Sequence, residues 1–241
     1  MDPLAGYPVV APPLRGPAVL DQRWTEVSFL HWPVDPHAAR RFYPPGTRPD
    51  VFDGQTYVGL VPFAMRSAGF ARVGGIPYFG SFLETNVRLY SVDDAGRHGV
   101  LFLSLDTSRL AVVPLARALL GLPYLWSLMR LRHDGARIEY CANRRWPERG
   151  ARSRLVLDIG EPVDPTPLEI WLTARWGLHT SRLGRTWWIP NAHPTWSLSA
   201  ARLVRMEDEF LTAAGIHRAG GILRPLFSPK VRTQFGVPQP L

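Results

Sequence analysis

Hydrophobic and polar residues alternate along much of the chain, and this pattern is typical of strands with one buried face. In residues 79–92 (FGSFLETNVRLYSV), Glu84, Asn86 and Arg88 share one parity, while residues 83, 85, 87 and 89 of the other parity are apolar apart from one threonine. Residues 98–106 (HGVLFLSLD) form a nearly continuous apolar run, which predicts a strand buried on both faces. Further strands are expected at residues 24–35, 55–67, 135–144, 152–160, 185–193 and 224–236.

Fewer segments carry helical signals. Residues 107–121 predict a helix in which Thr107 or Ser108 caps the first turn and Gly121 lies just past the end. Shorter helical segments are expected directly after the 24–35 strand and within residues 195–215.

A further helix is expected in residues 164–179. Asp164 or Thr166 can cap its start, and Pro167 suits the first turn. Because strands outnumber helices and the two do not alternate regularly, we expect a mainly β fold of the α+β class.

The composition is that of a globular protein, with 46% hydrophobic and 20% charged residues. Without a repeat or a linker, one domain is expected over residues 21–241, after a flexible leader at residues 1–20 that lacks the features of a signal peptide. The single cysteine, Cys141, suits a reducing compartment, so we expect a cytoplasmic protein. The longest apolar run, residues 110–129, is interrupted by Arg117, and we expect no membrane span.

The net charge of +8 invites a nucleic-acid partner, but its distribution argues against one. Lys230 is the only lysine, and the arginines are spread along the chain in short, interrupted groups. This pattern favours a solvated, arginine-rich surface over a nucleic-acid site. The sequence leaves open whether the protein forms a homo-oligomer.

Glu84, Asn86 and Arg88 form the best polar group in the sequence. They lie on one face of the expected strand, so all three point inward together if that face lines a cavity. Arg88 would then bind a substrate carboxylate, and Glu84 would act as an acid or a base. The alternative is a cross-strand ion pair on a solvated face, or a salt bridge that closes one end of the fold.

His193 and Trp196, in the segment NAHPTWSL, are a further candidate for ligand binding. A histidine beside a tryptophan can carry a proton at the entrance of a pocket, although a turn histidine without chemistry is the alternative. His31 is expected to be buried at a strand end. The histidines are too widely spaced for a metal motif, and paired cysteines and acidic calcium loops are missing, so we expect no metal and no cofactor.

Several segments together resemble the YqjF-like family of bacterial proteins of unknown function, which is grouped with the acetoacetate decarboxylase-like superfamily. They are FLHWPVDP, FDGQTYVGLVPFAMR, FLETNVRLY, GVLFLSLDTSRLAVVPLARALLGLPY, LEIWLTARWGLHT and FSPKV, in family order over residues 22–236. The resemblance implies a curved, closed or nearly closed β-barrel with a few peripheral helices and an internal cavity.

The resemblance also bears on the chemistry. In acetoacetate decarboxylases the Schiff-base lysine follows a Gly-x-Pro element, and GLPY resembles that element with Tyr124 in place of the lysine. A phenol cannot form an imine, and the only lysine, Lys230, lies far along the chain, so imine chemistry is expected to be lost. Tyr124 would instead donate a hydrogen bond to a carbonyl or enolate oxygen, or simply pack with its hydroxyl on a backbone carbonyl. GSFLE resembles the decarboxylase GPYxE segment, whose glutamate helps form the active site, and this implies a catalytic Glu84.

Two functional hypotheses follow. The first is an enzyme that acts on a small carboxylate or keto acid through Arg88, with Glu84 and Tyr124 handling protons. The second is a non-catalytic protein that binds or senses a small molecule in the same cavity. The lack of an imine-forming lysine in the GLPY element is the reason for keeping the second.

Overall fold

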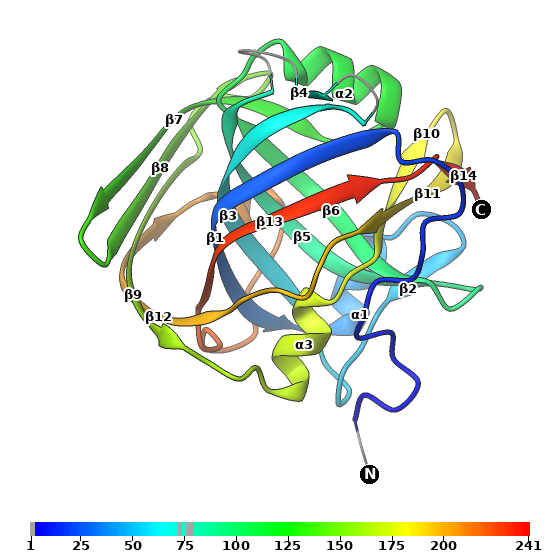
Figure 1. The fold of residues 1–241 in the computed structure, drawn as a ribbon, viewed down its shortest axis with the longest axis horizontal. Helices are drawn as coiled ribbons and strands as arrows, with labels where there is room; N and C mark the ends of the chain where they lie inside the picture. The colour runs from blue at the N-terminus through cyan, green and yellow to red at the C-terminus, as the bar shows by residue number, and fades with distance from the viewer. Residues whose placement is uncertain (1–2, 72–73, 76–79) are drawn as a thin grey trace.

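The computed structural model describes residues 3–71, 74–75 and 80–241, and strands dominate it (Figure 1). The strands are β1 (Leu20–Val34), β2 (Thr47–Pro49), β3 (Thr56–Phe70), β4 (Gly74–Gly75), β5 (Phe82–Asp93), β6 (His98–Thr107), β7 (Tyr124–Asp134), β8 (Arg137–Trp146), β9 (Arg152–Pro162), β10 (Gly177–Arg182), β11 (Arg185–Ala192), β12 (Ser199–Asp208), β13 (Leu226–Phe235) and β14 (Gln239–Pro240). The described helices are short: α1 (Pro36–Ala39), the 3-10 turn η1 (Arg40–Phe42), α2 (Val112–Leu120), α3 (Pro167–Thr173) and α4 (Phe210–Ala213). The mainly β prediction is confirmed.

The strands pair into one strongly curved sheet. The first and last long strands, β1 and β13, lie side by side and antiparallel across the middle of the molecule (Figure 1). Strands β13, β1, β3, β5 and β6 follow one another in pairing, and from β6 the sheet continues both into β7, β8, β9 and β12 and into β10 and β11. Both branches return to β13, so the hydrogen-bonded pairings close on themselves.

Strand β5 lies between the two branches, and apolar clusters cover both of its faces. Val87 and Leu89 belong to a cluster that also contains side chains of β8 and β9. Tyr90 belongs to a second cluster with Trp171 of α3, and Phe82 belongs to a third. This double coverage explains why nearly every residue of β5 is buried, the charged ones included.

The predicted helices are shorter than expected. Helix α2 ends at Gly121, whose φ of 66° confirms the predicted C-terminus, but the predicted N-caps are wrong. Thr107 is the last residue of β6, and the Ser108 hydroxyl accepts a hydrogen bond from the Leu83 amide. Strand pairing beyond residue 106 therefore uses the residues that the local pattern assigns to a cap.

In α3, Thr166 is the N-cap, as predicted, and forms a capping box with Glu169. The predicted extension of this helix to residue 179 is wrong. From Gly177 onward the chain forms β10, because these residues pair with β6 and β11. The strand β7 was not predicted, since its apolar start reads equally well as the end of the preceding helix.

The predicted leader contacts the rest of the chain along the part that the structure describes. The Tyr7 hydroxyl donates to the Ala174 carbonyl at 2.7 Å, and the Trp176 indole donates to the Pro8 carbonyl. The Val19 amide donates to the Phe235 carbonyl at 2.8 Å. The leader therefore packs beside α3 and β13 before the first strand begins.

Among the helices that the structure describes, none has the length and apolar character needed to cross a membrane. Within the same residues, no group of three or more His, Cys, Asp or Glu side chains is arranged to hold a metal ion.

Candidate functional site

Glu84 is buried in the middle of the sheet and bonded to Tyr124. On β5 it pairs with Phe63 of β3 on one side and Thr107 of β6 on the other, and it is only 3% exposed. The Tyr124 hydroxyl, at the start of β7, donates to Glu84 Oε2 at 3.0 Å. The structure thus joins two residues, 40 positions apart, that the sequence proposed as the catalytic pair.

The surroundings of Glu84 favour its protonated form. The pKa of Glu84 is raised to about 8, and burial is the largest cause. The nearby Asp106 also acts to raise it, while hydrogen bonds from Tyr124 and Asn86 act in the opposite direction. Burial and the Glu84 carboxyl also raise the pKa of Tyr124. The phenol therefore keeps its proton and donates a hydrogen bond with it. A carboxyl group with a pKa near neutrality can both give and take a proton, as a general acid or base must.

Asn86 continues the same face of β5 and is buried, at 4% exposed. Its Oδ1 atom has no hydrogen-bond partner within the described part of the chain. An unsatisfied buried acceptor costs about 1–3 kcal/mol, so such an atom is available to a ligand donor. Glu84, Asn86 and Tyr124 are called the carboxyl end of the site from here on.

Arg88, four residues further along β5, is also buried, at 7% exposed. Its Nε and Nη2 atoms each donate to the Tyr90 hydroxyl at 3.3 Å, and Nη2 donates to the Leu172 carbonyl at 3.4 Å. The guanidinium lies over the Phe29 ring, 5.6 Å from its centre. These hydrogen bonds are long, and Nη1 makes none to a described residue.

No described carboxylate forms an ion pair with Arg88. The two other deeply buried arginines have one: Arg144 donates to Asp106 through two nitrogens at 2.8 and 3.0 Å, and Arg175 pairs with Asp50. A buried guanidinium normally requires such an anion, because removing a charge from water is expensive. Arg88 is therefore the group in this region best suited to a bound anion.

The residues around Arg88 keep it directed away from Glu84. Tyr90 accepts from Arg88 and is hydrogen-bonded to His31 Nε2. Burial, together with the charges of Arg88 and Arg175, holds the pKa of His31 well below its usual value. His31 is therefore neutral and can accept a hydrogen bond from the Tyr90 hydroxyl. Gly59 faces this group, and a Cβ there would lie only 3.1 Å from the His31 ring and 3.3 Å from Arg88 Cγ.

His193 and Trp196 belong to the same region as Arg88. The His193 ring lies 5.0 Å from that of Trp196 and 4.7 Å from that of Trp176, and Trp196 in turn lies 5.0 Å from Phe29. The pKa of His193 is lowered to about 4, mainly by burial. The hydrogen bond to the Pro194 carbonyl acts to raise this pKa, and the charge of Arg88 acts to lower it. Nδ1 bonds to that carbonyl at 2.7 Å, so a neutral His193 presents Nε2 as an acceptor. Arg88, Tyr90, His193 and Trp196 are called the guanidinium end.

Glu84, Asn86 and Arg88 are thus all buried on β5, but their functional groups form two ends. Four residues of strand separate Glu84 from Arg88 by roughly 13 Å. The alternative of a solvated ion pair is wrong, because both residues are buried and no ion pair joins them. Pockets of about 440 Å³ between η1 and β10 and about 420 Å³ beside α2 lie elsewhere, and none of Glu84, Asn86 and Arg88 lines either.

Sequence reasoning missed Tyr90 and the buried ion pairs. Tyr90 has the same parity as Glu84, Asn86 and Arg88, so extending the alternation by one step identifies it. The partners of Arg144 and Arg175 lie 38 and 125 residues away, and no local pattern indicates them.

A hydrogen-bonded chain of serine, histidine and aspartate lies outside the two ends. Ser91 Oγ lies 2.8 Å from His179 Nδ1, and His179 Nε2 lies 3.2 Å from Asp93 Oδ2. Arg97 donates to the same carboxylate at 2.6 Å. Ser91 and His179 are fully buried, so the chain joins β5 to β10 and presents no nucleophile to a substrate.

The only lysine does not contribute to either end. Lys230 is exposed on β13, opposite Thr25 of β1. An amine that forms imines near neutral pH needs a desolvated or electropositive environment, and an exposed strand position does not provide one.

Comparison with known proteins gives matches over most of the chain. The profile of the DUF2071 family, described as "Uncharacterized conserved protein (COG2071)", matches residues 21–232. "Uncharacterized protein YqjF" of Bacillus subtilis (strain 168) is 30% identical over 200 residues, which cover 82% of each chain.

Solved structures with the same fold are distant in sequence. Acetoacetate decarboxylase from Legionella pneumophila superposes with a TM-score of 0.66 at 12% identity, over 96% of this chain and 91% of the other. The enduracididine biosynthesis enzyme MppR, complexed with pyruvate, superposes with a TM-score of 0.62 at 14% identity, over 93% of this chain and 91% of the other.

Proposed function

The chain belongs to the uncharacterized DUF2071 family and has the fold of acetoacetate decarboxylase, and from this premise we propose that it acts on a small carboxylate or keto acid without forming an imine. Arg88 binds the carboxylate, and Glu84 and Tyr124 move protons. The observation that carries this proposal is the buried guanidinium of Arg88, which lacks a carboxylate partner among the described residues.

The ligand class follows from the chemistry of the guanidinium end. A planar guanidinium forms paired, charge-assisted hydrogen bonds with a carboxylate, and these are strong where water is excluded. Neutral His193 offers an acceptor beside it, which suits a hydroxyl or an enol of the same ligand. The structural neighbour MppR is complexed with pyruvate, which is a ligand of this class.

The carboxyl end supplies the proton transfer. When Glu84 is ionised it can remove a proton from the carbon beside a keto group, and the Tyr124 hydroxyl can donate to the enolate oxygen that results. The same proton then returns from Glu84 to carbon. Because burial raises the pKa of Glu84 to about 8, its ionised fraction increases as the pH rises toward that value.

Ligand entry requires side-chain movement. The rings of Phe29 and Trp196 pack beside Arg88, and the Tyr90 hydroxyl occupies two of its donors. A carboxylate that replaces the Tyr90 contact gains shorter, charge-assisted bonds, and this gain drives the opening.

The free cysteine, Cys141, is consistent with a cytoplasmic site of action.

The second candidate is a binding or sensing protein without turnover. Its support is the distance along β5, since Arg88 and Glu84 lie roughly 13 Å apart along the backbone by strand geometry, and a three-carbon acid bound by Arg88 reaches Glu84 only after the side chains around it move. On this alternative Arg88 still binds the ligand, and Glu84 has no chemical role.

Titration calorimetry with pyruvate tests the binding step. The wild-type chain should bind pyruvate, and Arg88→Leu should abolish that binding. Arg185→Leu removes an exposed arginine of β11 and should change nothing. Equal affinity of Arg88→Leu and the wild type would disprove the role of Arg88.

Proton exchange separates the two candidates. In D₂O, an enzyme of this kind replaces the methyl protons of pyruvate with deuterium, which proton NMR follows directly. Glu84→Gln should lose the exchange and keep the binding. Binding without exchange in the wild type would instead favour the sensing protein. Borohydride should trap no pyruvate adduct on Lys230, and a trapped adduct would restore imine chemistry.

A further inference from the structure

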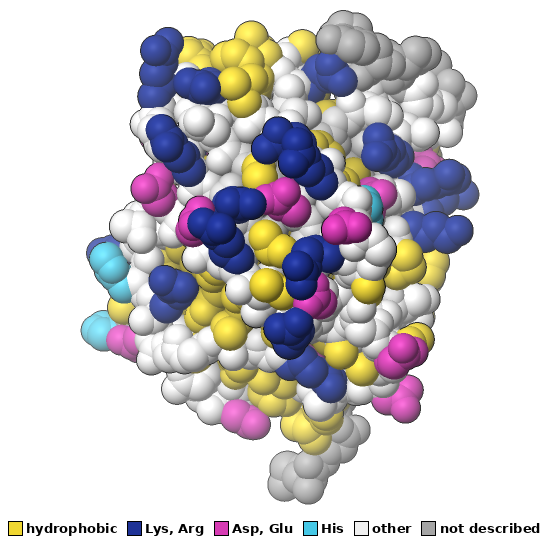
Figure 2. Space-filling view, turned by 90° about the vertical axis from the view of Figure 1, so that its left-hand side faces the viewer, with side chains coloured by type: hydrophobic (Ala, Val, Ile, Leu, Met, Phe, Trp, Pro, Cys, Tyr) yellow, Lys and Arg dark blue, Asp and Glu magenta, His cyan; other side chains and the backbone are white. Residues whose placement is uncertain are grey.

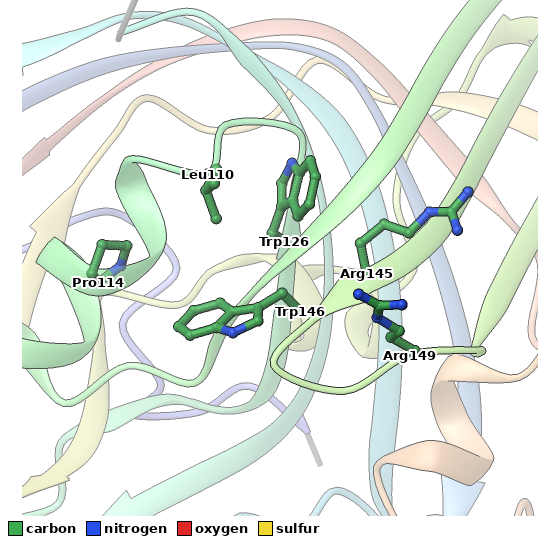
Figure 3. A pocket seen from close by; sticks show the side chains of 6 residues that line it. All are labelled: Leu110, Pro114, Trp126, Arg145, Trp146 and Arg149. Carbon is green, nitrogen blue, oxygen red and sulfur yellow. The ribbon is translucent and has the colours of Figure 1, made fainter.

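A separate pocket lies on the outside of the sheet, between the start of α2 and the β7–β8 pair (Figure 3). Its volume is about 420 Å³, within the range of small-molecule sites, roughly 300–1,000 Å³. The side chains that line it are Leu110, Pro114, Trp126, Arg145, Trp146 and Arg149. None of these belongs to the carboxyl end or the guanidinium end.

The walls of this pocket are apolar and aromatic. Trp126 and Trp146 are direct partners across the β7–β8 pair, and Leu110 and Pro114 face them from the start of α2 (Figure 3). Trp146 is 45% exposed and Leu110 is 47% exposed. Such large apolar surfaces gain free energy when a flat apolar group removes them from water.

Both charged groups of the pocket are positive and unpaired. Arg145 and Arg149 are exposed, and neither forms an ion pair or a hydrogen bond with any residue that the structure describes. Glu148, which lies next to Arg149 in the chain, bonds to Arg144 at 3.3 Å instead. In Figure 3 the Arg149 guanidinium turns back toward Trp146, and that of Arg145 extends outward.

Several arginines of the surrounding surface are paired with carboxylates, unlike the two that line the pocket. The face that contains β7, β8, β9 and β12 carries many arginine side chains with acidic ones among them (Figure 2). There Arg137 bonds to Asp158 at 2.6 Å, and Arg154 bonds to Glu139 at 2.7 Å. Exposed pairs of this kind satisfy one another, whereas the arginines of the pocket leave a positive charge beside an apolar hollow.

We propose that this pocket binds a small aromatic carboxylate. The flat ring lies against Trp146 and Pro114, and the carboxylate takes hydrogen bonds from Arg149, with Arg145 adding positive charge. Burial of the ring supplies most of the affinity, and the guanidinium groups select an acid over a neutral molecule. This site is independent of the proposed function at Arg88.

A second copy of the chain fits the pocket less well. In a twofold dimer the same patch lies on both sides of the interface. Arg145 and Arg149 would then face their own copies, and no acidic side chain is among those that line the pocket. The charge therefore favours an anionic ligand over self-association.

Naphthalene-2-carboxylate is the test ligand, titrated into the full chain while tryptophan fluorescence is followed. We expect saturable quenching, and we expect naphthalene-2-carboxamide, which lacks the charge, to bind about tenfold more weakly or worse. The double variant Arg145→Gln/Arg149→Gln should show the same loss for the acid and little change for the amide. Arg185→Gln is the matched control with one exposed arginine removed, and it should bind like the wild type.

Three results would overturn the proposal. The first is equal affinity for the acid and the amide, and the second is undiminished binding of the acid by the double arginine variant. The third is a wild-type dimer in sedimentation velocity that Trp146→Ala dissociates, which would make the pocket an interface between copies. Arg88→Leu should leave naphthalene-2-carboxylate binding intact, so a failure at one site is separable from a failure at the other.

Discussion

Two groups of buried charges in this protein are built differently. In the first group, Asp106 holds Arg144 and Asp50 holds Arg175, each as a direct ion pair. In the second group, Glu84 has a phenol as its partner, and Arg88 has a phenol and a backbone carbonyl. Asp106 and Arg144 lie in the same curved sheet as Glu84 and Arg88, Asp50 and Arg175 lie in loops beside it, and all six are buried to a similar degree.

The difference separates structural charges from candidate functional charges. A buried ion pair with good geometry satisfies itself and needs no ligand. A buried carboxyl or guanidinium without an opposite charge is kept at a cost in stability, and such groups are characteristic of sites where a ligand completes the electrostatics. On this comparison Arg144 stabilises the fold, and Arg88 is the buried charge to which our proposal gives a ligand.

The largest expected effect comes from breaking an ion pair. Arg144→Met leaves Asp106 buried without its cation and should lower the free energy of unfolding by about 3–5 kcal/mol. Arg88→Met removes a buried charge that has no carboxylate partner, and it should change the free energy of unfolding by about 1 kcal/mol or less. Urea unfolding of both variants measures the contrast, and equal losses would contradict the distinction.

A smaller effect is expected from the pH dependence of Glu84. Burial raises its pKa from 4.5 to about 8, so between these values the folded chain holds a proton that the unfolded chain releases. The Glu84 contribution to stability is fully present below pH 4.5 and is lost as the pH rises toward 8.

Glu84→Gln removes this titration. The free energy of unfolding of the wild type should therefore fall relative to Glu84→Gln as the pH rises from 4.5 to 8, by an amount on the order of a few kcal/mol. Urea unfolding across this range measures it. A constant difference between the two proteins at every pH would show that Glu84 is not held protonated.

The smallest effect concerns the hydrogen bond between the two residues of the carboxyl end. Tyr124→Phe keeps the ring and removes the donor to Glu84, at a cost of about 1 kcal/mol. Because that bond lowers the pKa of Glu84, its loss should move the titration of Glu84 to higher pH. Carbon-13 NMR of the glutamate carboxyl groups measures the shift, and an unchanged or lower pKa would mean that the bond does not act on the carboxyl.

The strand-rich fold and the composition of one face follow from local patterns in the chain. Alternation in the segment FLETNVRLY places Glu84, Asn86 and Arg88 together, because side chains two residues apart on a strand must point the same way. The local pattern also predicted a helix start with Asp164 or Thr166 as its cap, and the structure selects Thr166. Short-range geometry is sufficient for both.

Whether that face is buried, and which groups each charge contacts, depends on how distant strands pack together. Alternation is the same whether a strand is covered on one face or on both, and β5 is covered on both because the sheet continues from β6 in two directions. The approach of Tyr124 to Glu84, and the absence of an anion near Arg88 among the described residues, depend on strands distant in sequence. Packing between such strands sets the local dielectric environment and the neighbouring charges, and these determine whether a carboxyl holds its proton and a guanidinium can accept a ligand.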